Sequence, residues 1–385
     1  MFSFYCAFSQ YQKLSPDAEI SIITIAQGEQ LYDSFGHSAI RVVDKNKNLD
    51  KVYNYGIFDF NTPNFYSKFM RGKLLYSLGT DPTFAFLRYY SRQNRAIREQ
   101  VLNLKQQEKQ QYFEFLENNA KPENKKYLYD FFFDNCATKL RDVTTTVLQD
   151  KVNYKDDLLK KDFTFRDLIY QKLDNQIWGK FGIDIALGSV IDRKASAKEY
   201  TFLPSYVFDN FKNAKINVNG NEENLVKKTN YLYKPLSEIK NNKTNTNFFL
   251  TPMSLFILIG LVVLFITLRD IKTKKQTRWL DFIILFVTGL VGLLVFLLWF
   301  ATDHKATGNN FNIFWAFVPN LTVAFLIFKQ RKFLKKYYLV LVLLLLVLVV
   351  FWILKIQVFN IALVPILLFL MVRYLFLWKY LAVKS

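Results

Sequence analysis

The chain has 385 residues, enough for about two domains, and its 51 lysines and arginines against 32 acidic residues give a formal net charge of +19 at pH 7. This charge suggests nucleic-acid binding, but we find no zinc-ligand spacing, no Walker loop and no basic helix with base-reading residues, so no nucleic-acid partner is expected. With two histidines, two cysteines and no carboxylates at a suggestive spacing, no metal site is expected either.

The chain begins with an apolar stretch, Met1–Ser9, that ends in small residues like the end of a signal peptide. It lacks a basic n-region and is too short for a complete signal. We therefore treat residues 1–12 as the remnant of a signal peptide or leader and expect the true start to lie upstream. A short disordered N-terminus is the alternative interpretation.

Residues 13–210 are predicted to form an α+β domain. Three β-prone stretches read as strands, and the Asn- and Asp-rich turn between the second and third favours a hairpin: Ile20–Ala26, Ser38–Val43 and Val52–Phe60. A short helix ending at Gly72, a further strand and two segments of helical periodicity follow: Asn64–Arg71, Lys73–Leu78, Phe84–Tyr90 and Gln106–Glu117.

An aromatic run, Tyr127–Phe133, leads into the second cysteine of the chain, Cys136. Apolar residues then recur at helical spacing, which predicts a helix that Cys136 opens: Ala137, Leu140, Val143 and Val147. Asp134 and Asn135 are both suitable N-caps for this helix.

Residues 211–250 are rich in Asn and Lys without clear periodicity, and we expect a partly ordered connector there. Residues 251–385 are predicted to be a transmembrane domain. They contain five apolar runs, each close to the ~20 residues that a bilayer core requires: Pro252–Leu268, Leu280–Phe300, Phe311–Phe328, Tyr337–Leu354 and Ile356–Leu377.

Lysines and arginines are concentrated in the loops 269–279 and 329–336, whereas the loops 301–312 and 355–357 carry one lysine each. By the positive-inside rule the first two loops face the cytoplasm. This places residues 1–250 outside the cytoplasm and the C-terminus inside, as in a multi-pass membrane protein.

Cys136 and His37 are the best candidates for chemistry. Cys6 lies in the leader, so the exported part keeps a single thiol, which is a liability in an oxidising compartment unless it is buried or used. A cysteine at a helix N-terminus has a lowered pKa, and a histidine on a facing strand can act as its base. The alternative is that Cys136 is a small buried hydrophobe.

A third polar group usually orients such a histidine. Asp59 is the first candidate, because the predicted hairpin brings it near His37, and Asn54 is the second. The peptide N–H at Asn135–Cys136 is a candidate donor for an oxyanion, with Asn135 as support.

A second polar cluster lies on the outward loop between the second and third spans. It contains Asp303, His304 and Asn312, which are candidates for a substrate site at the membrane surface. An ordinary solvated loop is the alternative.

The sequence resembles one known family over nearly its whole length, from about Leu14 to the last span. The stretches that carry the resemblance are Leu31–Arg41, Tyr53–Phe60, Asp134–Asp142, Gly182–Gly188 and Thr302–His304. They are similar to those of the Lnb family, membrane proteins of Bacteroidota that join a periplasmic domain to a transmembrane domain.

The resemblance implies a lipoprotein N-acyltransferase with a permuted papain-like fold, similar to NlpC/P60 and lecithin:retinol acyltransferase domains. The reactive pair of the family maps onto Cys136 and His37, whereas no motif fixes the third member. The implied acyl donor is a membrane phospholipid, the implied acceptor is the N-terminal amine of a lipoprotein, and no cofactor is expected. The alternatives are a cell-wall peptidase or amidase of NlpC/P60 type and a non-catalytic membrane-anchored binding module.

Overall fold

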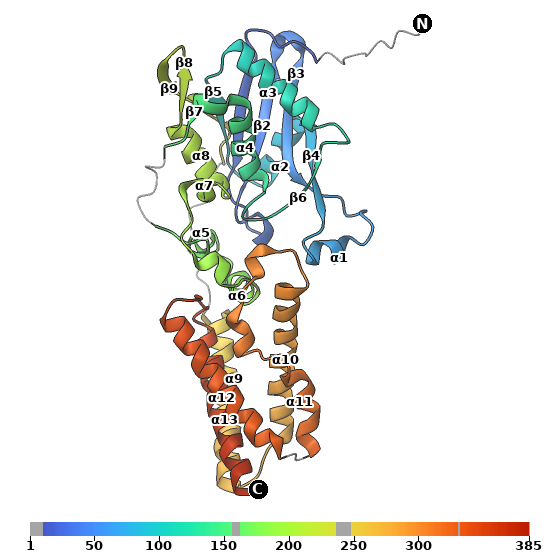
Figure 1. Cartoon of the computed structure of the whole chain (residues 1–385). Helices are drawn as coiled ribbons and strands as arrows, with labels where there is room; N and C mark the ends of the chain where they lie inside the picture. The colour runs from blue at the N-terminus through green and yellow to red at the C-terminus, as the bar shows by residue number, and fades with distance from the viewer. Residues whose placement is uncertain (1–10, 156–161, 236–247, 330–331, 385) are drawn as a thin grey trace. The chain divides into compact units, whose positions relative to one another are not determined.

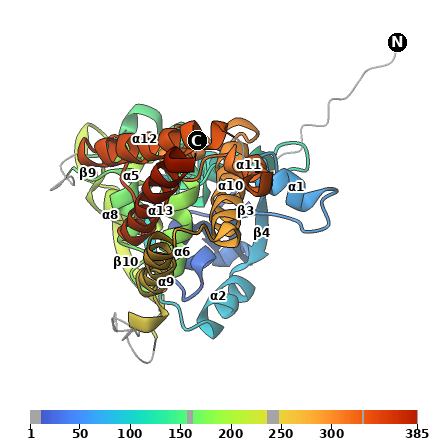
Figure 2. The ribbon, with the colours of Figure 1, turned by 90° about the horizontal axis from the view of Figure 1, so that it is seen from below.

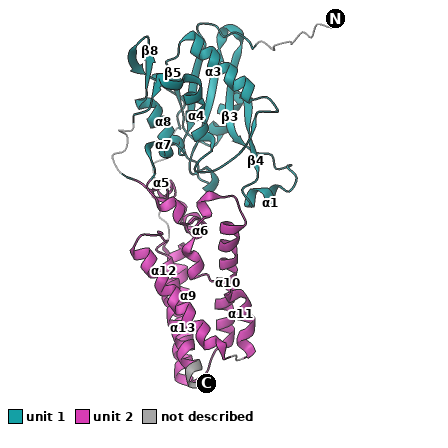
Figure 3. Cartoon of the chain, viewed as in Figure 1, with its two compact units in different colours: residues 1–162, 195–240 teal, residues 163–194, 241–385 magenta. Residues whose placement is uncertain are grey.

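The chain forms two compact units in a computed structural model that describes residues 11–155, 162–235, 248–329 and 332–384 (Figure 3). Unit 1 comprises residues 1–162 and 195–240, and unit 2 comprises residues 163–194 and 241–385. The predicted leader, residues 1–12, lies almost wholly outside the described residues. The units also differ from the predicted boundaries, because residues 163–194 group with the membrane region.

Unit 1 is built on a seven-stranded antiparallel sheet with the strand order β10-β5-β1-β2-β3-β4-β6 (Figure 1). Its strands are β1 (Glu19–Ile25), β2 (His37–Asp44), β3 (Leu49–Ile57), β4 (Leu75–Pro82), β5 (Ile97–Leu102), β6 (Lys126–Leu128) and β10 (Val226–Tyr233). The predicted strands of the first hairpin are thereby confirmed, while β5, β6 and β10 were not predicted.

Helices cover both faces of this sheet, since alternate strand residues point to opposite sides. On one face, Ile22 and Ile40 join a core shared with α3 (Gln106–Asn119), α4 (Cys136–Leu148) and α8 (Pro204–Asn213). On the other face, Ile23 and Ala39 pack with α2 (Thr83–Arg92). The remaining helices of unit 1 are α1 (Phe65–Met70) and α7 (Ala197–Tyr200).

The region expected to be an irregular connector contains regular strands. β8 (Lys215–Val218) and β9 (Asn221–Asn224) form a small sheet with β7 (Val152–Asn153), and β10 pairs with β5. The prediction failed here because β9 is exposed along its length and β10 is an edge strand, so neither shows the alternation of a half-buried strand. Residues 236–247 of the predicted connector lie outside the described residues.

Unit 2 is helical. Its helices are α5 (Phe165–Tyr170), α6 (Ile177–Ala186), α9 (Pro252–Thr273), α10 (Arg278–Phe300), α11 (Asn320–Leu326), α12 (Phe333–Ile353) and α13 (Leu363–Lys384). Within the described residues, four helices are long and apolar enough to cross a membrane, namely α9, α10, α12 and α13. Figure 2 shows this group of helices from below.

The predicted span over residues 311–328 is not one continuous helix, so the expectation of five transmembrane helices is not confirmed. A 3-10 turn, Phe311–Phe314, is followed by the seven-residue α11, which begins directly after Pro319. Proline lacks the N–H that a continuing helix requires. The segment nevertheless runs back along α10, because the ring of Phe328 lies 5.2 Å from that of Trp279.

Two glycines of α10 allow this broken segment to pack closely. A Cβ atom at Gly289 would lie 2.2 Å from the Leu321 nitrogen, and one at Gly292 would lie 2.0 Å from the Ala316 oxygen. Small residues are the usual means by which membrane helices bring their backbones together.

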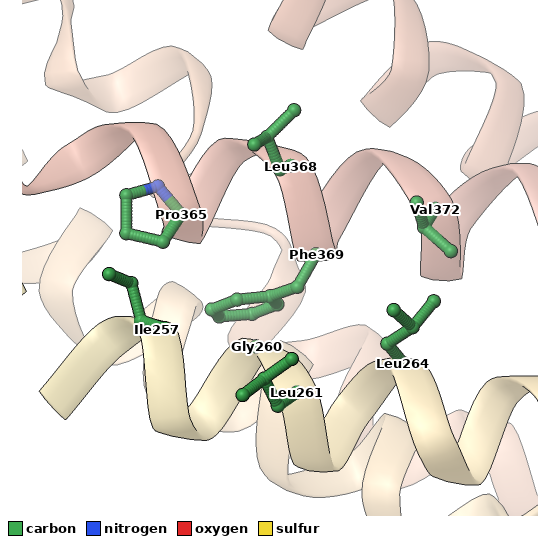
Figure 4. Close-up of a pocket in the computed structure, with 8 residues that line it drawn as sticks. All are labelled: Ile257, Gly260, Leu261, Leu264, Pro365, Leu368, Phe369 and Val372. Carbon is green, nitrogen blue, oxygen red and sulfur yellow. The ribbon is translucent and has the colours of Figure 1, made fainter. Parts of the chain in front are cut away.

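On another side of unit 2, α9 and α13 enclose an apolar groove of about 240 Å³. Figure 4 shows its lining residues: Ile257, Gly260, Leu261, Leu264, Pro365, Leu368, Phe369 and Val372. Further along α13, a buried ion pair joins Arg373 to Asp281 of α10, with a distance of 2.6 Å from Nε to Oδ1, and Arg373 also contacts Asp270 of α9. A charge in this region is tolerated only when it is paired.

A second buried network holds residues 163–194 to the membrane helices. Arg166 Nη1 lies 2.6 Å from Asp184 Oδ1, and Arg166 Nε lies 2.6 Å from Asp192 Oδ1. Asp184 also accepts a hydrogen bond from Asn360, and Asp192 accepts one from the Val358 N–H, both in the turn before α13. These bonds explain why the segment belongs to unit 2.

We predict that Asp184→Ala lowers the midpoint of thermal unfolding in detergent by about 5 °C or more, because removing one member of a buried ion pair leaves its partner poorly compensated. The matched control is Asp174→Ala, since Asp174 is an exposed carboxylate in the same segment. Equal midpoints for the two variants would contradict a stabilising role for the network.

Candidate active site

The position of Cys136 is set by the cap of α4. Asn135 is the N-cap, and its Oδ1 accepts hydrogen bonds from the N–H groups of Ala137, at 2.8 Å, and Thr138, at 2.9 Å. Thr138 Oγ1 in turn accepts from the Asn135 N–H at 2.8 Å. This reciprocal capping box makes Cys136 the first residue of the helix, as predicted.

Asn135 is therefore a structural support. Its Nδ2 donates to the carbonyl oxygens of Phe131, at 2.8 Å, and Phe202, at 2.7 Å, so both ends of the side chain are occupied. Asp134, the other predicted cap, instead pairs with Lys139. Within the described part of the chain, the N–H of Cys136 itself has no hydrogen-bond partner, which leaves it as a donor at the site.

His37 is the first residue of β2, and its Nε2 lies 2.6 Å from Asn54 Oδ1. Since a carbonyl oxygen only accepts, Nε2 carries a proton and donates it to Asn54. The imidazole ring also stacks on Tyr90, with 6.0 Å between the ring centroids. The other ring nitrogen, Nδ1, is thus left for the hydrogen bond with Cys136.

Cys136 and His37 each shift the pKa of the other. Burial on its own would raise the pKa of Cys136, but the charge of His37, their hydrogen bond and the N–H groups of Ser38 and Ala137 outweigh it and lower that pKa. For His37, burial would lower the pKa, but the Cys136 thiolate and Asn54 raise it. The arrangement favours a thiolate beside an imidazolium.

Of the two candidates for orienting His37, the structure places Asn54, and not Asp59, at hydrogen-bond distance from the imidazole. Asp59 is exposed beyond the end of β3, and its Oδ1 accepts from the Asn61 N–H at 2.8 Å. The hairpin register pairs Ile40 with Tyr53, and its continuation places Gly56 opposite His37. The tight turn at Lys45–Lys47 shortens the loop, so the predicted register was displaced by about two residues.

Gly56 lies against the reactive cysteine at a bulge in β3. A Cβ atom at Gly56 would be 3.5 Å from Cys136 Cβ and 3.7 Å from Tyr129 Cε2. Its φ of +96° strains any residue that has a side chain. The bulge lets β3 bend beneath Cys136, and the sequence signal for it was the glycine inside a strand pattern.

Tyrosines form the wall around Cys136. The pKa of Tyr129 lies well above its usual value because of burial and the nearby negative charge of Cys136, and the pKa of Tyr127 is raised by the same two causes. Tyr129 stacks on Tyr76 with 4.3 Å between ring centroids. These phenols remain protonated at neutral pH. Sequence reasoning noted the aromatic run but gave none of its members a place in the site.

The predicted cluster at the outward membrane loop belongs to unit 2. Asn312 is buried. Its Nδ2 donates to the backbone carbonyl oxygen of Asp184 at 3.0 Å, and its Oδ1 accepts from the indole N–H of Trp315. It therefore ties this loop to the segment that carries Arg166. Asp303 is exposed and His304 is half-buried. A substrate-binding role for these residues stays a prediction.

Two family models match the sequence. The model described as the Lnb N-terminal periplasmic domain covers residues 7–171, and the one described as the Lnb transmembrane domain covers residues 243–384. The first match includes Cys136, His37 and Asn54. No curated protein and no solved structure matches the chain.

The ion pair predicts how fast Cys136 reacts with iodoacetamide as the pH changes. In a Cys6→Ser chain we expect a rate profile whose midpoint lies below the ~8.5 of an ordinary cysteine, because only the thiolate reacts. His37→Gln should move the midpoint upward and slow the reaction at pH 7 about tenfold. The control is His304→Gln, and an unchanged profile in His37→Gln would refute the pairing.

Asn54 and Asp59 are distinguished by the same measurement. Asn54→Ala should shift the midpoint upward, because His37 loses the acceptor that stabilises its protonated form. Asp59→Ala should leave the profile unchanged. A shift in Asp59→Ala without one in Asn54→Ala would reverse the assignment.

Proposed function

The chain belongs to the Lnb family, as a membrane protein with a periplasmic domain, and we propose that it is a lipoprotein N-acyltransferase whose acyl carrier is Cys136. The observation that carries the proposal is the Cys136–His37–Asn54 arrangement, in which a helix N-terminus and an imidazolium stabilise a thiolate. A membrane protein has phospholipid esters at hand as acyl donors.

In the first half-reaction, Cys136 Sγ attacks the carbonyl carbon of a phospholipid ester. The tetrahedral intermediate collapses when the carbon–oxygen bond breaks, and His37 gives its Nδ1 proton to the departing oxygen. The products are a thioester on Cys136 and a lysophospholipid. The N–H of Cys136 is the proposed oxyanion donor, because Asn135 occupies the next two N–H groups of the helix.

In the second half-reaction, the N-terminal amine of a lipoprotein attacks the thioester carbonyl. His37, now neutral, takes a proton from the attacking amine, and the carbon–sulfur bond breaks to give an amide and the free thiolate. Asn54 keeps the ring oriented through both steps because it holds Nε2–H. The thioester must be kept from water, because water would hydrolyse it. The burial of Cys136 among tyrosines limits the access of water to this position.

The proposed location is the bacterial inner membrane, with unit 1 in the periplasm and the C-terminus in the cytoplasm. The proposal rests on the clustered lysines and arginines between α9 and α10 and before α12.

The test is intact-protein mass spectrometry of the membrane-purified protein, with and without neutral hydroxylamine. We expect a hydroxylamine-labile mass increase of fatty-acyl size in the wild type and in the matched control Cys6→Ser, and none in Cys136→Ala. Absence of an adduct after incubation with phospholipid and without acceptor would count against acyl transfer. Cleavage of purified peptidoglycan without phospholipid would identify a cell-wall peptidase or amidase instead.

A further inference from the structure

Large apolar side chains gather on the surface of unit 1 between β3 and β4. We call residues 58–75, which include α1, the aromatic loop. Its exposed apolar residues, with their exposed fractions, are Phe58 (39%), Phe60 (68%), Tyr66 (74%), Phe69 (51%), Met70 (61%) and Leu75 (49%). The surface of a water-soluble domain seldom collects so many.

The aromatic loop has a defined structure. Phe65 is its buried anchor, with 8% exposure, and its ring packs against Phe58 and Phe60. Left-handed residues, Asn64 and Gly72, stand at the two ends of α1. The exposed rings therefore belong to an ordered element. An ordered apolar patch on a surface usually marks a site of interaction.

Basic residues accompany these rings. The loop carries Lys68, Arg71 and Lys73 but only one acid, Asp59, whose carboxylate holds the Asn61 N–H. Bulky apolar side chains beside lysine and arginine suit the boundary of a bilayer, where rings enter the acyl region and cations meet anionic headgroups. A protein partner would be expected to cover the rings without requiring this excess of positive charge.

A row of aromatic rings in contact connects the aromatic loop to the reactive pair. The centroid of Phe58 lies 5.1 Å from that of Phe60 and 5.4 Å from that of Tyr76. Tyr76 stacks on Tyr129, which borders Cys136 and Gly56. Contacts between aromatic side chains thus lead from the exposed loop to the residues that border the thiol.

We infer that the aromatic loop inserts into the outer boundary of the anionic membrane and delivers the acyl chain of a phospholipid along the aromatic row to Cys136. The delivery step rests on the proposed function, whereas the insertion does not. On this inference the aromatic loop contacts the phospholipid that donates the acyl chain. The competing possibility, which the test must distinguish, is that the loop binds the lipidated acceptor.

Insertion is tested with the full chain in nanodiscs of phosphatidylethanolamine and phosphatidylglycerol that contain doxyl-labelled lipid. In a Cys6→Ser, Cys136→Ala chain, Tyr66→Cys carries a bimane label. The matched control is Phe84→Cys on α2, because Phe84 is 73% exposed against 74% for Tyr66. We expect the label at 66 to be quenched at least about twofold more than the label at 84.

Quenching should also weaken when Lys68→Glu and Arg71→Glu are introduced, since these changes repel anionic lipid. Equal quenching at the two positions, or none at position 66, would overturn the insertion. Quenching at position 66 that requires added diacylated lipopeptide would assign the loop to the acceptor and overturn the inference.

Delivery is tested with the triple change Phe60→Ser, Phe69→Ser and Met70→Ser, against Phe84→Ser with Tyr89→Ser as control. We expect the triple variant to form the Cys136 thioester from phospholipid at least about tenfold more slowly. Its iodoacetamide reaction at Cys136 should match the wild type, which shows that the fold and thiolate are intact. An unchanged thioester rate would overturn delivery, while failure of the wild type to form any thioester would refute the proposed function and leave the quenching result standing.

Discussion

The reactive pair depends on the complete hydrogen bonding of one amide side chain. Asn135 fixes the first turn of α4 through Oδ1 and ties that turn to two other segments of the chain through Nδ2. Because this cap begins the helix, Cys136 lies at its first position, beside the Ser38 N–H and His37 on β2. An ordinary N-cap stabilises a protein by about 1 kcal/mol. In this protein the cap also provides the electrostatic environment that a buried thiolate requires.

Those parts of the site that depend on residues close together in the sequence could be predicted from it. Polar residues before an apolar helical pattern located the start of α4, and β-prone stretches located the first hairpin. The sequence ranked Asp59 above Asn54 as the partner of His37, whereas the structure places Asn54 beside it. This choice depends on strand register, which the turn at Lys45–Lys47 and the bulge at Gly56 determine. Similarly, Pro319 interrupts an apolar run that hydropathy alone cannot distinguish from a continuous span.

The two units depart from ordinary burial in opposite ways, since unit 2 buries charged side chains and unit 1 exposes apolar ones. In unit 2, charged side chains such as Arg373 are concealed inside the bundle, where Asp270 and Asp281 neutralise them. In unit 1, by contrast, large apolar rings are presented outward around α1. Paired charges are what a helical bundle in lipid requires, whereas so many exposed rings are unusual for a domain in water.

The chain path also limits how this protein can be divided. It leaves unit 1 after residue 162, returns at residue 195 and leaves again after residue 240. Any contiguous fragment that contains both parts of unit 1 and ends before the membrane helices therefore retains residues 163–194, while it loses Asn360 and the Val358 N–H, the partners of Asp184 and Asp192. A soluble form of unit 1 would have to be spliced, with a short linker that joins residue 162 to residue 195, rather than truncated.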